Sequence, residues 1–114
     1  MHAFTVGHGT RPLEELIQIL REAGVRTLVD VRRFPGSRRN PQFNQGPLCE
    51  ALADAGVEYR HAVELGGRRR DEPGEDDFTC IRVPAFRSYA AHMRSEAWQT
   101  ALTAELAQPS PCFM

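Results

Sequence analysis

Four arginines stand close together in the segment VDVRRFPGSRRNPQFN, residues 29–44. Arginine carries a planar guanidinium fork that binds carboxylate and phosphate groups through paired hydrogen bonds. Ser37 and Asn44 of the same segment add hydroxyl and amide hydrogen-bonding groups. The segment therefore predicts an anion-binding site. The arginines expected to neutralise the charge of the anion are Arg32, Arg38 and Arg39.

A second interpretation of these arginines is structural: Arg32 forms an ion pair with Asp30 or Glu64, and the other arginines are solvated. Side chains alternate along a strand, which places Asp30 and Arg32 on one side and Arg33 on the other. We expect at least two of the arginines to form an anion site, because polar loops at strand ends often carry function. Glu64 is counted among the ligand-binding residues, since it lies at the carboxyl end of the third predicted strand.

His8 and Asp30 are the candidates for proton chemistry. His8 stands between two glycines in GHG, on a predicted strand-end turn, where it could act as a general acid or base, or orient a ligand. Its alternative role is to fix the turn through hydrogen bonds to the backbone. Asp30 is a poor base at neutral pH, because neighbouring guanidinium groups lower the pKa of a carboxyl group. Orienting Arg32 is its expected role.

The composition excludes several classes of protein. The chain of 114 residues has a formal net charge of −1, so any nucleic-acid partner must be bound by a local cluster of charge. Its three cysteines show neither a disulfide pattern nor the spacing of a zinc site, so we expect no metal. No apolar run approaches the roughly 18 residues of a membrane span, and the first residues do not show a basic segment followed by an apolar signal core. We therefore expect a cytoplasmic protein with no membrane partner, and the cofactor is unknown.

Alternating helical and strand patterns run along most of the chain. Pro12 and Pro47 mark helix starts, Gly24 and Gly56 mark helix ends, and Ser95 is expected to cap the last helix. Residues 66–85 are expected to form a lid or a disordered segment. The predicted strands cover residues 3–7, 25–31 and 57–65, with a fourth beginning within 109–114; the predicted helices cover residues 12–23, 47–55 and 86–107, the last with a joint at residue 95.

Two successive strand–helix–strand units predict an α/β fold. Such units form a parallel sheet with right-handed crossovers, so we expect a single Rossmann-like domain over residues 1–114, with three layers (α/β/α) and about four strands. In such sheets ligands bind outside the carboxyl ends of the strands. His8 and the arginine loop follow predicted strands and Glu64 lies at the end of one, so they should meet at this edge.

The segments VGHGTRPLEELIQIL, VDVRRFPGSRRNPQFN, GVEYRHAVELGGRRR and PAFRSYAAHMRSEAWQTAL resemble domain-of-unknown-function family 488, in the same order and at similar separations. The resemblance implies a compact α/β domain of bacterial and archaeal proteins and no particular reaction. Members typically continue past the fourth strand with a cysteine-containing segment and a Cys-His-Arg motif, whereas this sequence stops at Pro-Cys-Phe-Met. We therefore expect a C-terminally truncated chain, whose exposed sheet surface would favour a homodimer.

Three functional hypotheses follow from these observations. The first is an arginine-rich pocket at the carboxyl edge of the sheet that binds a small anionic ligand, phosphorylated or nucleotide-like, with His8 carrying any proton transfer. The second is a nucleic-acid-binding module that uses the same loop against the phosphate backbone. The third is an inactive fragment of an enzyme family. Whether the protein is an enzyme stays open.

Overall fold

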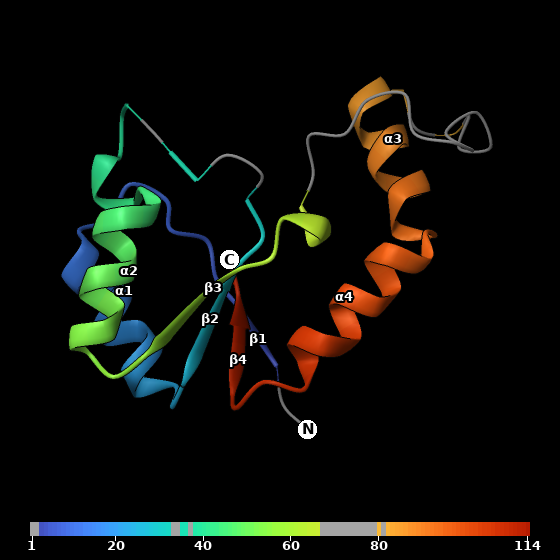
Figure 1. Ribbon diagram of the computed structural model, residues 1–114. Helices are drawn as coiled ribbons and strands as arrows, with labels where there is room; N and C mark the ends of the chain where they lie inside the picture. Colours follow the sequence, from blue (N-terminus) through green and yellow to red (C-terminus); the bar gives the residue numbers. More distant parts are fainter. Residues whose placement is uncertain (1–2, 33–34, 37, 67–79, 81) are drawn as a thin grey trace.

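The computed structural model describes residues 3–32, 35–36, 38–66, 80 and 82–114, and its elements alternate between strands and helices (Figure 1). The strands are β1 (Phe4–Thr5), β2 (Thr27–Asp30), β3 (Glu58–His61) and β4 (Pro111–Phe113). The α-helices are α1 (Leu13–Glu22), α2 (Gln45–Asp54), α3 (Pro84–Met93) and α4 (Glu96–Leu106), and two 3₁₀ turns are η1 (Pro41–Phe43) and η2 (Val63–Leu65).

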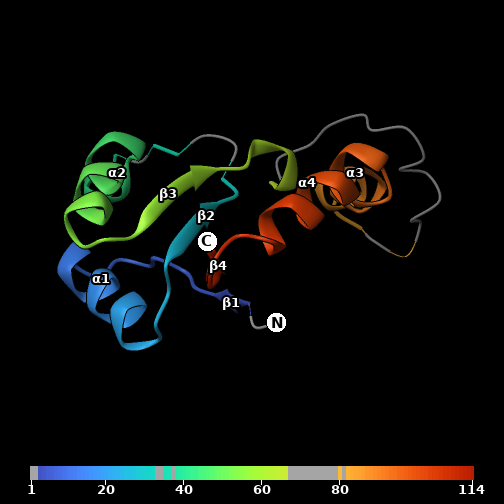
Figure 2. The same ribbon diagram turned by 60° about the horizontal axis from the view of Figure 1, so that its bottom comes forward.

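The four strands form one parallel sheet in the order β1-β4-β2-β3. The connections through α1 and α2 move across the sheet in one direction, whereas the connection through α3 and α4 runs back. Right-handed crossovers then place the two pairs of helices on opposite faces. Figures 1 and 2 show this arrangement, with α1 and α2 on one side of the sheet and α3 and α4 on the other. The predicted α/β fold is confirmed.

The hydrophobic core lies between the sheet and the first two helices. Leu16 and Leu20 of α1 and Leu48 and Leu52 of α2 are buried against Leu28 of β2. The spacing of four residues within each helix puts both leucines on one face, which is the pattern of an amphipathic helix. The core holds β2 in place, so the residues that follow β2 start from a rigid support.

Helix α4 is joined to the opposite face of the sheet by polar contacts. Arg60 of β3 donates two hydrogen bonds to the Glu105 carboxylate, from Nε at 2.8 Å and Nη2 at 3.1 Å. Thr27 of β2 donates to the carbonyl oxygen of Pro109, which follows α4. The polar residues of β2 and β3 on this face therefore hold the sheet to α4.

Several predicted bounds differ from those in the structure, and two of the differences have a clear physical cause. Helix α2 begins at Gln45, two residues before Pro47, because the first turn of a helix leaves its N–H groups without intrahelical partners and so accommodates proline. Strand β3 ends at His61 and is followed by η2. Its neighbour β2 ends at Asp30, and after the hydrogen bond from Ala62 N–H to the Asp30 carbonyl oxygen, at 2.8 Å, β3 has no further residues of β2 to pair with. Of the expected lid, residues 67–79 and 81 lie outside the described residues.

Candidate functional site

The carboxyl ends of β2 and β3 lie side by side because these strands are parallel neighbours. In their register Leu28 lies opposite Tyr59, and Asp30 lies opposite His61. Residues two apart on a strand point to the same face, so Asp30 and Tyr59 share the face that α1 and α2 cover. The register therefore brings a carboxylate and a phenol together at the edge of the core.

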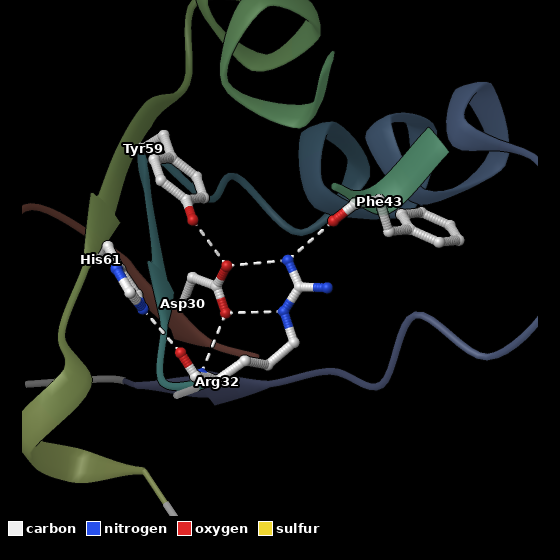
Figure 3. Close-up of polar contacts among 5 residues, drawn as sticks. All are labelled: Asp30, Arg32, Phe43, Tyr59 and His61. Atoms are coloured by element: carbon white, nitrogen blue, oxygen red, sulfur yellow. Dashed lines mark hydrogen bonds and ion pairs between the residues drawn. The ribbon is translucent and has the colours of Figure 1, made fainter. Parts of the chain in front are cut away.

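The Asp30 carboxylate is fully buried and accepts four hydrogen bonds (Figure 3). Oδ1 accepts from the Arg32 backbone N–H at 3.1 Å and from Arg32 Nε at 2.8 Å. Oδ2 accepts from Arg32 Nη2 at 2.8 Å and from the Tyr59 hydroxyl at 2.6 Å. Both oxygens are thus occupied by protein donors, which suits Asp30 to orienting Arg32 and not to accepting a proton from a substrate.

The Arg32 guanidinium is fixed on two sides. Its Nε and Nη2 edge binds Asp30, and Nη2 also donates to the backbone oxygen of Phe43 at 2.8 Å. Figure 3 shows the third nitrogen, Nη1, pointing away from the carboxylate. The Arg32 side chain is 19% exposed while that of Asp30 is 0% exposed, so the pair lies at the boundary between core and solvent.

The pKa shifts of these three groups favour the charged pair. Burial alone would raise the pKa of Asp30, but hydrogen bonds from Arg32 and Tyr59 and the adjacent guanidinium charge together lower it. Burial likewise disfavours the charged Arg32, yet Asp30 raises its pKa overall. Burial and the hydrogen bond to Asp30 raise the pKa of the Tyr59 hydroxyl. At neutral pH the cluster consists of a carboxylate, a guanidinium and a neutral phenol.

His8 is linked to the Asp30–Arg32 pair by Phe43, which contacts both His8 and Arg32. The His8 ring stacks on the Phe43 ring, with centroids 4.6 Å apart and planes inclined by 26°. His8 Nδ1 lies 2.7 Å from the backbone oxygen of Gly9, which requires Nδ1 to donate. In the neutral ring Nε2 is then the nitrogen that accepts a proton. Arg32 binds the backbone of Phe43 and His8 binds its ring, so both flank one residue.

The other predicted site residues are distributed differently. Arg38 and Arg39 are exposed on the loop that follows β2. Asn44 is the N-cap residue of α2 and is half-buried. Glu64 lies apart from the Asp30 cluster, on η2, with its carboxylate 3.9 Å from His92 Nε2 of α3. Ser37, together with Arg33, lies outside the described residues.

Two contributors to the cluster were not expected from the sequence: Tyr59 binds Asp30, and the Phe43 carbonyl binds Arg32. His61 was expected at this edge of the sheet but not among the site residues, and its Nε2 donates to the Arg32 carbonyl oxygen at 2.6 Å. Alternation along β3 puts Tyr59 and His61 on one face, but only the register with β2 shows that Asp30 shares it. The carbonyl of Phe43 has no signal in the sequence, because any residue supplies one.

Two further properties concern the described part of the chain. Among residues 3–32, 35–36, 38–66, 80 and 82–114, no three histidine, cysteine, aspartate or glutamate side chains are grouped to hold a metal ion. Over the same ranges, every helix is too short or too polar to cross a membrane.

The parallel sheet, with helices on both faces and an ion pair at the carboxyl end of β2, defines an α/β protein. The chain belongs to the family described as domain of unknown function DUF488, whose model matches residues 12–113. No curated protein and no solved structure matches the chain. The family is therefore known, and the function is inferred from the site.

Proposed function

We propose that the protein binds a small anionic ligand, phosphate-bearing or carboxylate-bearing, at the carboxyl edge of its sheet. The observation that carries this proposal is the state of Arg32. Asp30 and the Phe43 carbonyl fix its guanidinium, while Nη1 points away from that carboxylate (Figure 3). A guanidinium held rigidly before a ligand arrives loses little conformational entropy on binding, which favours affinity.

The geometry of Arg32 also limits how it can bind an anion. The paired Nε and Nη2 edge is already bound to Asp30, and the second hydrogen of Nη2 is directed to Phe43. An incoming oxyanion therefore receives hydrogen bonds from Nη1 alone. The rest of the positive charge must come from elsewhere, and among the described residues of the same loop Arg38 and Arg39 are exposed arginines.

The backbone is open to solvent at the glycines of this edge. A Cβ atom built on Gly7, Gly9 or Gly36 would meet no other atom within 4 Å, as is also the case at three glycines elsewhere in the described chain. Gly7 and Gly9 flank His8, and Gly9 has a positive φ of 57°, which disfavours other residues there. A ligand could therefore approach the backbone beside His8, whose Nε2 is available to accept a proton.

Binding of phosphate, pyrophosphate and mononucleotides is measured by two-dimensional NMR of the isotope-labelled protein. We expect at least one probe to shift the Arg32 side-chain resonances and the amides around His8, and Arg38→Ala with Arg39→Ala to weaken the binding about tenfold or more. Arg26→Ala is the matched control, because Arg26 is exposed and directly precedes β2 at the opposite edge. Absence of binding by every probe would reject the proposal, as would equal weakening by Arg26→Ala.

The exposure of Arg38 and Arg39 also supports the second candidate function, which is contact with the nucleic-acid phosphate backbone. Such binding releases counterions, so the logarithm of the association constant falls steeply and linearly with the logarithm of the salt concentration. It also depends little on the nucleotide sequence. A small-ligand site saturates with one molecule. Titration with a short single-stranded oligonucleotide at two salt concentrations distinguishes these outcomes.

A further inference from the structure

Strand β1 forms one edge of the described sheet and pairs there with β4 alone (Figure 2). Val6 N–H donates to the Phe113 carbonyl oxygen at 3.0 Å, so the backbone groups of Val6 point toward β4. The N–H and C=O groups of successive strand residues point to opposite sides, so those of Phe4 also face β4 and those of Thr5 face away from it. The edge therefore presents the N–H and the carbonyl oxygen of Thr5 outward.

The β1 edge lacks the charges and prolines that commonly block the pairing of sheet edges. Residues 1–10 contain no aspartate, glutamate, lysine, arginine or proline. The strand at the other edge of the described sheet, β3, carries Glu58 and Arg60 within its four residues. The two edges of the sheet therefore differ, and β1 is the one whose sequence permits a further strand to pair with it.

A groove next to β1 extends this uncharged surface. Phe4, which is 37% exposed, lines the groove together with Ala23 at the C-cap of α1 and with residues between the end of α4 and the start of β4. None of the residues that line the groove is charged. Phe4 therefore offers apolar surface that a neighbouring strand at this edge would cover.

We propose that β1 pairs with β1 of a second copy of this chain, antiparallel about a two-fold axis through Thr5. Thr5 then exchanges two backbone hydrogen bonds with Thr5 of the partner subunit, and each Phe4 lies opposite Val6 of the partner subunit. Apolar residues that lie opposite each other on two paired strands stabilise the pair. The sheets of the two copies become one continuous sheet.

Charge favours a second copy as the occupant of this edge. A two-fold pair brings residues 3–7 of both copies together, and none of these residues is charged, so no like charges oppose the contact. The first charged residue of the sequence, Arg11, forms an ion pair with Glu15 and binds the carbonyl oxygen of Gly7, which lies at opposite ends of the pair in the two copies. Since β1 has only two residues, we expect a weak dimer that forms at high protein concentration.

Sedimentation equilibrium of the whole protein, between about 10 µM and about 1 mM, measures the dimerisation constant. Thr5→Lys and Thr5→Glu each place two like charges opposite each other across the axis, so each variant should dimerise about fivefold more weakly than the unmodified protein, or weaker still. An equimolar mixture of the two variants pairs lysine with glutamate. The mixture should therefore associate about fivefold more tightly than either variant alone, or tighter still, at low salt.

Thr100→Lys and Thr100→Glu are the matched controls, because Thr100 is an exposed threonine of α4, and they should leave the dimer unchanged. Thr5→Pro removes the outward N–H but leaves the bonds of Phe4 and Val6 to β4, so it should be monomeric. Circular dichroism checks that each variant is folded, and the charge variants decide the question if Thr5→Pro is not. An unmodified protein that stays monomeric over the whole range, a mixture that associates no better than its components, or equal weakening by the Thr100 variants overturns the proposal.

Discussion

Removing the hydroxyl of Tyr59 tests the account of the Asp30 cluster most directly. Tyr59→Phe deletes one of four hydrogen bonds to a fully buried carboxylate, the bond of 2.6 Å to Oδ2, and leaves the three from Arg32. A hydrogen bond to a charged group contributes about 1.5 to 3 kcal/mol. Oδ2 keeps its bond to Arg32, so we expect a loss near the lower end, about 1.5 kcal/mol, in the free energy of unfolding.

The pH dependence of this loss carries the stronger test. The pKa of Asp30 is lower in the folded protein than its ordinary value of 3.8. The stability that its charged form contributes is therefore present above that value and lost as the pH falls through the folded pKa. Because the Tyr59 hydroxyl favours the charged form, the effect of Tyr59→Phe should be constant between about pH 7 and pH 5 and should shrink below about pH 4.

Urea denaturation at several pH values measures this difference. Tyr89→Phe is the matched control, because the Tyr89 hydroxyl donates to an uncharged acceptor, the carbonyl oxygen of Leu65 at 2.9 Å. Tyr89→Phe should lower the free energy of unfolding by about 0.5 to 1.5 kcal/mol, independently of the protonation of Asp30. If Tyr59→Phe costs nothing at neutral pH, or costs the same at about pH 3, then Asp30 and Tyr59 are not coupled as described.

Three further outcomes are expected. In an alkaline titration monitored by tyrosine absorbance, one tyrosine should ionise with a pKa above the ordinary value near 10. This late absorbance change should be absent in Tyr59→Phe; if it persists in that variant, the raised pKa does not belong to Tyr59. Ser95→Ala should lower the free energy of unfolding by about 1 kcal/mol, because Ser95 Oγ accepts from Trp98 N–H, whereas the exposed Thr100→Ala should cost far less. Cys112 is 1% exposed and burial raises its pKa to about 11, so a thiol reagent should label only the other two cysteines until denaturant is added; immediate labelling of all three would contradict its burial.

The helix ends show how far local sequence predicts this fold. Gly24 and Gly56 follow the C-caps of α1 and α2 with φ values of 73° and 78°, a conformation that glycine adopts without strain. Ser95 caps α4 as its type and position predicted. These features depend on interactions within one turn of the chain, which is why the sequence alone revealed them.

The order of the strands and the partners of Asp30 depend on distant contacts. Nothing in the periodicity of PCF shows that β4 inserts between β1 and β2. The sequence allowed either Asp30 or Glu64 as the partner of Arg32. In the structure Arg32 pairs with Asp30, whereas Glu64 lies on η2 beside His92 of α3. Tyr59 could be assigned to the same cluster only once the register of β2 and β3 was known.

The position of β4 has a consequence for how the protein is made. Phe4 lies opposite Cys112 and Thr5 lies opposite Phe113, so among the described strands β1 pairs with β4 alone. During synthesis β2 and β3 can pair once β3 has emerged, but β1 must wait until β4 leaves the ribosome. Loop closure over such a separation is slow. Of the four described strands, β1 is therefore translated before the others yet stays unpaired until β4 is available.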